Sequence, residues 1–395
     1  MLCALLVGAP AAHCEAPSGT QEIVLGMSTV LSGAASDLGR RMKTGVDAAI
    51  ARANRSGGVH GRAIRLVALD DGYEPVRTVP NMRQLIEREN VLAVIGNVGT
   101  PTAIAATPIA VAEHTLFFAA YSGSDGLRPQ RPERYVINYR ASYSEEATAM
   151  IDALIDRGGL APEDIAFFIQ DDGYGDSGFR GVMAALRRHG LRDESSVVRV
   201  SYKRNTLDVE DAVASLLIAP HTPRAIAMVG AYAPCAKFIR LCRDAGIDPL
   251  FLNLSFVGSS SLAAALGKTQ ARVMITQVVP HPDARGLPLI ADFREDLNRL
   301  DRGAEPTVTS LEGYVSMRIL TRALESMKEP PTREGIIDAL NAMGSFDMGI
   351  GESLRLSPQE HQACHRVWPT VMRGGTFVPI DWSELRSIID KESPL

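Results

Sequence analysis

Positive charge is missing from the start of this chain: the first 39 residues contain no lysine and no arginine. Over all 395 residues the formal net charge is −5, whereas a nucleic-acid-binding protein needs a basic face. We therefore expect no nucleic-acid partner. No apolar run after residue 14 reaches the ~20 residues of a membrane-spanning helix. What is present, 46% hydrophobic and 22% charged residues, is typical of a globular protein of about two domains.

Catalytic signatures are also absent from the sequence. It contains no G-x-S-x-G, H-E-x-x-H or P-loop motif and no paired-cysteine metal spacing. His361, Cys364 and His365 form a small cluster, but a structural zinc site needs a fourth ligand. We therefore expect no enzyme activity, no cofactor and no bound metal.

Cysteine is scarce, with five in the chain and three after residue 14. Cys235 and Cys242 are seven residues apart on a predicted helix, about 10 Å along its axis, which is too far for a disulfide. A disulfide between Cys364 and either of these two cysteines stays an open alternative. We favour three buried thiols, because free cysteine is usually found in protein cores.

The amino terminus has the pattern of an export signal. Leu2–Ala12 is a short apolar run that ends in small residues, and Ala12 and Cys14 occupy the positions that a signal peptidase inspects. We predict that residues 1–14 are a cleaved signal peptide and that the mature protein is periplasmic. A lipoprotein anchor at Cys14 is the less favoured alternative, because His13 stands where that signal has a small residue.

Strand and helix patterns alternate along the rest of the chain, and this alternation predicts parallel sheets flanked by helices. The strands expected in the first half are Ile23–Met27, Ile64–Leu69, Leu92–Ile95, Leu116–Ala120 and Tyr135–Tyr139. Those expected in the second half are Ile165–Ile169, Val197–Val200, Ala225–Val229, Leu250–Asn253 and Val273–Gln277. Three further helices are expected near Pro288–Arg302, Ser310–Glu325 and Arg333–Met343, followed by the turn-rich Gly344–Ser353.

Several spaced motifs between Glu22 and Met343 carry a family likeness. The runs STVLSGAASDLGRRMKTGVDAAIARANRSGGVHGRAIRLVALDDGYEP and LAVIGNVGTPTAIAATPIAV, then QDDGYGDSG and VGAYAPCAKFIRLCRDAG, occur in that order. This series resembles the periplasmic solute-binding proteins of the leucine/isoleucine/valine-binding type, the type I receptors of ABC importers. The resemblance implies two doubly wound parallel-sheet lobes joined by three crossovers, with the ligand held in the cleft by hinge closure.

We expect the crossovers near Ala141–Glu145, Thr276–Val279 and Gly349–Ser353. Residues 20–142 and 279–350 then form lobe 1, and residues 143–278 and 351–395 form lobe 2.

Loops at the carboxyl ends of the strands face the cleft of such a fold, and they supply the candidate ligand residues. In lobe 1, Thr100 is predicted to cap a helix that starts at Pro101, whose positive end suits an anion. The resemblance implies that a hydroxyl here holds the ligand's carboxylate. The run that follows the strand 116–120 adds hydroxyl and backbone contacts from Tyr121, Ser122, Gly123 and Ser124.

The remaining candidates are Tyr143 at the first crossover and four lobe 2 residues, namely Tyr174, Tyr232, Ser255 and Phe256. The resemblance implies that Tyr174 and Tyr232 line the pocket, and that amino-acid binders have acidic residues at the positions of Tyr143 and Ser255. Without these acids an ammonium group would be desolvated and unpaired, at a cost of several kcal/mol. Glu145 and Glu146 are expected to stabilise the first turn of a helix instead.

We therefore expect a monomeric periplasmic receptor that delivers a small molecule to an inner-membrane permease of the ABC type. Its ligand is expected to be a carboxylate-bearing or largely apolar solute rather than a standard amino acid. Two alternatives stay open. One is a carrier of a lipid or sterol-like ligand for a transporter outside the ABC class, and the other is the ligand-sensing subunit of a regulatory system.

Overall fold

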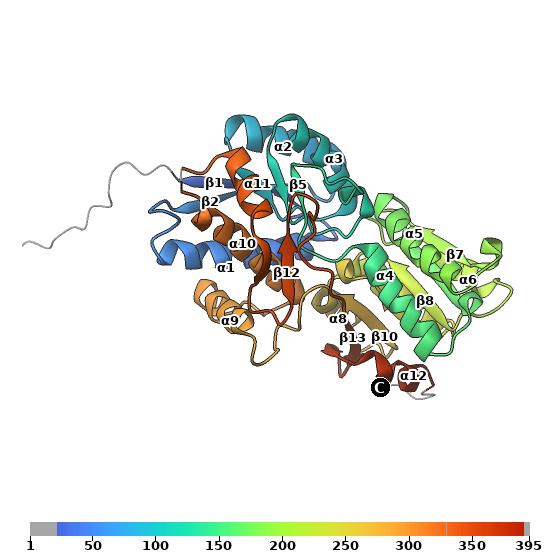
Figure 1. The fold of residues 1–395 in the computed structure, drawn as a ribbon. Coiled ribbons are helices and arrows are strands. Elements are labelled where there is room, and N and C mark those ends of the chain that lie inside the picture. Colours follow the sequence, from blue (N-terminus) through green and yellow to red (C-terminus); the bar gives the residue numbers. More distant parts are fainter. Residues whose placement is uncertain (1–21, 329, 391–395) are drawn as a thin grey trace, which may run out of the picture.

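The computed structural model describes residues 22–328 and 330–390, so the predicted signal peptide lies outside the described residues. Two α/β lobes lie side by side, each built on its own sheet (Figure 1). This arrangement confirms the parallel sheets predicted from the alternation of strands and helices, and the two doubly wound lobes that the family resemblance implies. No helix of the described part of the chain is long and apolar enough to cross a membrane.

The first lobe contains a five-stranded parallel sheet in the order β2-β1-β3-β4-β5. Its strands are β1 (Ile23–Thr29), β2 (Ile64–Asp70), β3 (Ala93–Ile95), β4 (Leu116–Phe118) and β5 (Val136–Ile137). Its helices are α1 (Ser36–Arg55), α2 (Pro75–Arg83), α3 (Thr100–Ala112), α9 (Pro288–Leu300), α10 (Val308–Ser326) and α11 (Arg333–Asn341). The π-helical turn η1 (Gln84–Arg88) extends α2, and the 3-10 turn η2 (Asp125–Leu127) follows β4.

The second lobe contains a seven-stranded sheet in the order β14-β13-β10-β9-β8-β6-β7. Strands β6 (Ile165–Gln170), β7 (Arg199–Tyr202), β8 (Ala225–Val229), β9 (Leu250–Asn253) and β10 (Val273–Gln277) are parallel. Strands β13 (Trp368–Arg373) and β14 (Thr376–Pro379) add an antiparallel edge. The helices are α4 (Tyr143–Asp152), α5 (Gly173–Arg188), α6 (Glu210–Leu217), α7 (Tyr232–Asp244), α8 (Ser259–Leu266) and α12 (Leu385–Asp390), with short turns η3 (Ala153–Arg157), η4 (Pro162–Asp164), η5 (Glu194–Ser196), η6 (Ser255–Val257) and η7 (Trp382–Glu384).

The chain passes between the two sheets three times: after β5, after β10 and before β13. The last passage differs from the one expected near Gly349–Ser353. There the chain makes the turn of a hairpin between β11 (Gly344–Asp347) and β12 (Ser353–Leu356), helped by the positive φ of Gly349. Leu354 and Cys364 then lie in the core of the first lobe, so the passage to the second lobe comes after Cys364.

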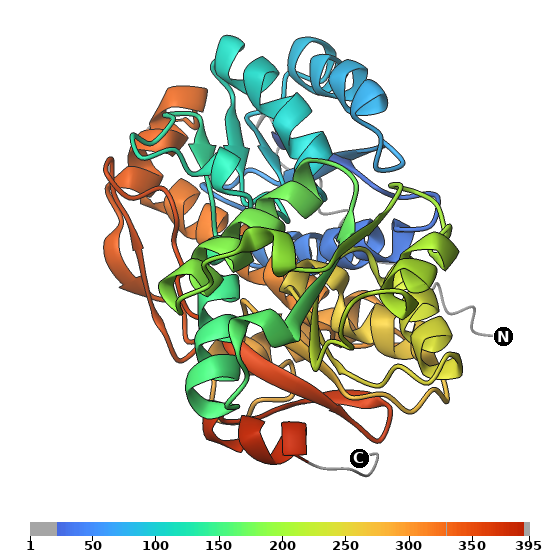
Figure 2. The same ribbon diagram turned by 90° about the vertical axis from the view of Figure 1, so that its right-hand side faces the viewer.

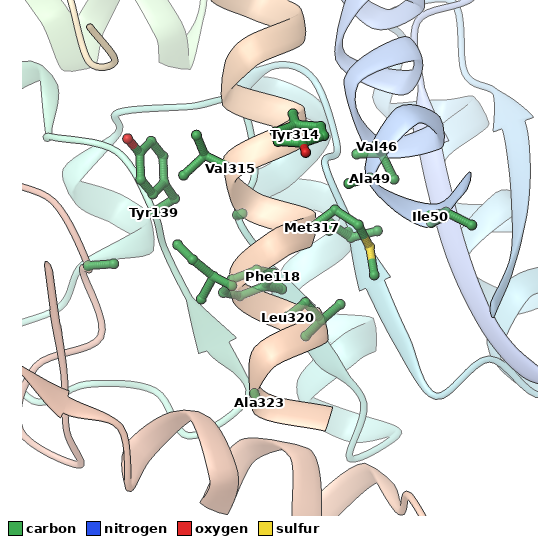
Figure 3. Close-up of a cluster of buried hydrophobic side chains, with 14 of the residues drawn as sticks. Val46, Ala49, Ile50, Phe118, Tyr139, Tyr314, Val315, Met317, Leu320 and Ala323 are labelled. Atoms are coloured by element: carbon green, nitrogen blue, oxygen red, sulfur yellow. The ribbon is translucent and has the colours of Figure 1, made fainter. Parts of the chain in front are cut away.

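The core of the first lobe lies where α1 packs along α10 (Figure 3). Val46, Ala49 and Ile50 of α1 face Met317 and Leu320 of α10, and Phe118 of β4 belongs to the same cluster. The helices approach closely because Gly45 presents no side chain: a β carbon there would overlap the Ser310 carbonyl oxygen. Gly313 of α10 allows the same approach from the other side, since a β carbon there would overlap the Met42 carbonyl oxygen.

Replacing Gly45 with alanine tests this close approach. We expect Gly45→Ala to destabilise the fold by ~1–3 kcal/mol, because the added methyl forces the two backbones apart. Gly303→Ala is the matched control, since a β carbon there would meet only Asp301 Oδ1, at 3.5 Å. Urea unfolding followed by circular dichroism measures both. A midpoint for Gly45→Ala equal to that of the control would contradict this account.

Candidate ligand site between the lobes

The two lobes face each other with the loops that follow their parallel strands. Figures 1 and 2 show the green and yellow second lobe against the blue and cyan first lobe, and α3 contacts α5 across the boundary. Thr100 and Tyr121 follow β3 and β4, while Tyr174 and Ser255 follow β6 and β9. The carboxyl ends of the strands of both sheets therefore meet at one interface.

Five aromatic rings fill the centre of this interface. Tyr73 and Tyr121 come from the first lobe, Tyr143 stands at the start of α4, and Tyr174 and Phe256 come from the second lobe. Phe256 lies among three of the rings, with centroid distances of 4.4 Å to Tyr174, 5.6 Å to Tyr121 and 6.1 Å to Tyr73. No member of this ring cluster is more than 1% exposed. In this closed arrangement the protein's own side chains occupy the interface.

Two glycines let the rings approach the backbone of the first lobe. A β carbon at Gly99 would overlap the ring of Tyr73, and Gly99 also has a φ of 115°. A β carbon at Gly123 would lie 2.6 Å from Tyr143 Cδ1, and the Tyr143 N–H donates to the Gly123 carbonyl at 2.6 Å. Both positions therefore require glycine for the ring cluster to form.

A hydroxyl group lies beside the rings at the start of α3. Thr100 Oγ1 is 2.7 Å from Ser122 Oγ and 3.4 Å from the Tyr143 hydroxyl. The expected cap differs in detail, because Gly99 takes the N-cap position and Thr100 is the first helical residue. The Thr100 hydroxyl is therefore free of the helix end and bonds across to Ser122 instead.

A buried ionic network lies next to the rings, on the first passage between the lobes. The Arg140 guanidinium contacts Glu312 of α10, with Nε 3.1 Å from Oε1, and its Nη2 donates to Ser255 Oγ at 2.8 Å. Arg140 also lies over the ring of Tyr121, 4.2 Å from its centroid. Three buried polar atoms here have no hydrogen-bond partner among the described residues, namely Arg140 Nε, Arg140 Nη1 and the Tyr174 hydroxyl oxygen.

The role of Glu146 differs from the expectation that it stabilises the first turn of a helix. This residue is buried rather than serving the helix end, and its carboxylate accepts from the backbone N–H of Ser255 at 2.8 Å and from Thr276 Oγ1 at 2.5 Å. Glu145 does have the expected role, because it forms a capping box with Ser142. The carboxylate that fastens Ser255 thus comes from α4.

Burial has the largest single effect on the pKa values of the charged groups in this network. It raises the pKa of Glu312 to about 7, although the nearby Arg140 acts in the opposite direction. Burial also raises the pKa of Glu146. For Arg140, burial alone would lower the pKa, but Glu312 and its other neighbours outweigh this and the pKa is raised. The guanidinium therefore stays charged inside the interface.

Two of the predicted residues lie outside the ring cluster. The Ser124 hydroxyl accepts from the Gly126 N–H and caps η2, which is a turn role. Tyr232 is half-buried at the start of α7, and burial raises its pKa. The structure brings the other eight together: Thr100, Tyr121, Ser122, Gly123, Tyr143, Tyr174, Ser255 and Phe256.

Polar contacts join the lobes at the rim of the interface. Arg204 of the second lobe binds Glu74 of the first and also Asp172, each at 3.0 Å. The side-chain amide of Asn205 donates to Glu74 at 2.6 Å, and that of Gln170 donates to the Tyr73 hydroxyl at 3.0 Å. This clasp of Arg204, Asn205 and Glu74 holds the lobes together beside the rings.

Sequence reasoning missed Tyr73, Arg140, Glu312 and Arg204. Tyr73 follows β2 in the same way that Tyr121 follows β4, so the strand-end rule identifies it as a candidate. The same rule identifies Arg140, three residues after β5, and Arg204, two residues after β7. Glu312 carries no such signal, because it lies within α10 and meets Arg140, 172 residues away, only in the folded chain.

Across residues 22–328 and 330–390, no three His, Cys, Asp or Glu side chains are arranged to hold a metal. His365 pairs with Glu145 instead, at 2.6 Å. Cys235, Cys242 and Cys364 are buried free thiols, as favoured from the sequence.

Known proteins are similar to this chain in sequence and in fold. A family model described as periplasmic binding protein matches residues 22–376. A solved possible leucine/isoleucine/valine-binding protein from Rhodopirellula baltica SH 1 is 45% identical, with a TM-score of 0.90 over 94% of this chain and 99% of that chain. The Leu/Ile/Val-binding protein homolog 2 of Brucella abortus (strain 2308) is 23% identical over 84% of this chain and 85% of its own length.

A solved fatty acid ABC transporter substrate-binding protein from Thermomonospora curvata shares the fold, with a TM-score of 0.80 and 22% identity over 95% of each chain. The family model covers nearly all of the described residues, and the Rhodopirellula protein agrees in both sequence and fold. The chain therefore belongs to the periplasmic binding protein family, as a type I member of the leucine/isoleucine/valine-binding group.

Proposed function

We propose that this protein is a periplasmic receptor that captures a small solute between its lobes and delivers it to an ABC-type importer of the inner membrane. Members of its family are solute receptors rather than enzymes. The observation that carries the proposal is the meeting of Thr100, Tyr121, Tyr174 and Phe256 at one interface, from the strand ends of two lobes that the chain joins three times.

Capture requires the lobes to separate, because the ring cluster fills the closed interface. A solute then enters between the strand ends, and the lobes close over it. Binding favours the closed state only as far as the solute contacts both lobes, since a ligand shifts an equilibrium by its difference in affinity for the two states.

We further propose that the solute is carboxylate-bearing or largely apolar rather than a standard amino acid. The three buried carboxylates beside the rings are already engaged: Asp71 by Ser28 and the Tyr73 N–H, Glu146 by Ser255 and Thr276, and Glu312 by Arg140. An α-ammonium group would have to break one of these contacts or remain unpaired. The hydroxyls of Thr100 and Ser122, by contrast, are suited to an anionic or neutral oxygen.

A thermal-shift screen of amino acids, organic acids and lipids tests the receptor function. A solute that binds only the folded protein adds ~2.7 kcal/mol of stability at a hundred times its Kd, so a true ligand raises the melting temperature clearly. If no solute of these classes raises it, the receptor proposal fails.

Thr100→Val tests the hydroxyl at the start of α3. We expect the affinity for the solute found in the screen to fall by ~1 kcal/mol, about fivefold, because a buried hydrogen bond is lost. Thr107→Val is the matched control, since Thr107 lies on the same helix and its hydroxyl donates only to the Ala103 carbonyl. Calorimetric titration that finds equal affinities for the two variants would remove Thr100 from the site.

Arg204→Ala tests the clasp. Without its cation, Glu74 and Asp172 face each other as like charges, so we expect a shift of ~1 kcal/mol towards open lobes. The shift should appear as a larger radius of gyration in small-angle X-ray scattering and a severalfold weaker affinity for the solute. Arg187→Ala is the control, because Arg187 pairs with Glu194 inside the second lobe. Scattering and affinity that both match the control would exclude the clasp from closure.

A further inference from the structure

We propose that the solute taken up between the lobes is a ring-bearing carboxylate, whose ring enters the cluster around Phe256 and whose carboxylate pairs with Arg140. This inference rests on the proposed receptor function and narrows its ligand class. The support comes from the rings, from the unpartnered polar atoms of Arg140 and Tyr174, and from the charges around them.

The ring cluster has the geometry that aromatic side chains prefer with one another. The four measured centroid distances lie between 4.4 and 6.1 Å, with interplanar angles of 32° to 50°. Tilted arrangements at such distances gain energy beyond simple area burial. A flat ring from a solute reproduces these contacts when the lobes part and close again, whereas a branched aliphatic chain does not.

Phe256 is the ring best able to yield. It lies on the three-residue turn η6, which is followed by Gly258 with a φ of 74°. Its ring has no polar group, whereas Tyr73 is held through Gln170 and Tyr121 through Ser255 and Thr309. A solute ring therefore gains access by shifting Phe256 without breaking a hydrogen bond of that side chain.

The polar group of the solute has to match the polar atoms of the interface that have no hydrogen-bond partner. Arg140 Nη1 is a cationic donor and the Tyr174 hydroxyl is a neutral one, and both are fully buried. The Arg128 guanidinium adds positive charge nearby, but its own donors are already engaged, with Nη1 donating to the Ser122 and Ser124 carbonyls and Nη2 to the Arg140 carbonyl. The free donors are therefore those of Arg140 and Tyr174. Donors of this kind recognise a carboxylate, which accepts charge-assisted hydrogen bonds.

Calorimetric titration of the wild-type chain with four probes tests the class. We expect benzoate and phenylacetate to bind at least tenfold tighter than the neutral isostere benzamide, and at least tenfold tighter than leucine. Equal affinities for benzoate and benzamide would overturn the role of the carboxylate. Tighter binding of leucine than of benzoate and phenylacetate would overturn the ring-bearing class while leaving the receptor function intact. If none of the four probes binds and the wider screen also finds no ligand, the receptor function fails together with the inference.

Phe256→Ala tests the place of the ring in the same titrations. We expect benzoate affinity to fall at least tenfold, because one wall of the cluster is lost. Phe179→Leu is the control, since Phe179 lies in the same lobe but packs against Phe167 and Arg199, away from the interface. Circular dichroism confirms that both variants are folded. Unchanged benzoate affinity in folded Phe256→Ala would place the ring elsewhere.

Discussion

The Arg140 guanidinium is buried at the junction of the two lobes, and its pairing constrains how they sit against each other. Leaving such a charge unpaired costs several kcal/mol, so the closed arrangement of the lobes has to keep its partners in contact with it. Glu312 comes from α10 of the first lobe and Ser255 from η6 of the second. Glu146 then fixes Ser255 from α4, which begins just after the passage that carries Arg140. One charge therefore ties the first passage to both lobes.

The ring cluster makes closure a competition between the protein and its solute. Apolar area buried between the lobes stabilises the closed state by ~25 cal/mol per Å² even before a solute contributes. A solute that replaces some ring contacts with similar ones gains little from those contacts alone. Its selectivity then depends on groups that the rings leave unsatisfied, and Arg140 Nη1 and the Tyr174 hydroxyl are such groups. The contacts among the rings therefore favour closure of the lobes, whereas the unpartnered polar atoms determine which solute binds.

The features set by local pattern were predictable from the sequence. Strands such as Ala225–Val229 and Leu250–Asn253 have the predicted bounds, and the strand-end rule found Thr100, Tyr121 and Ser255 before any fold was known. Features set by distant contacts were not. Glu146 has the sequence context of a first-turn carboxylate, and only its meeting with Thr276, 130 residues away, shows why it is buried. The hairpin β11–β12 was missed because its glycine-rich turn looks the same as a crossover loop in the sequence.

The direction of the pKa shift of Glu312 indicates what the ionic network contributes. Burial raises the pKa of the Glu312 carboxyl to about 7, although the pairing with Arg140 acts to lower it. Between its ordinary pKa, near 4.5, and 7, the folded protein binds this proton more tightly than the unfolded chain does. Ionising Glu312 therefore reduces stability as the pH rises through that range. The network also fixes geometry: the Arg140 guanidinium donates to Ser255 Oγ and lies over the Tyr121 ring, at the place where we propose that a solute carboxylate binds.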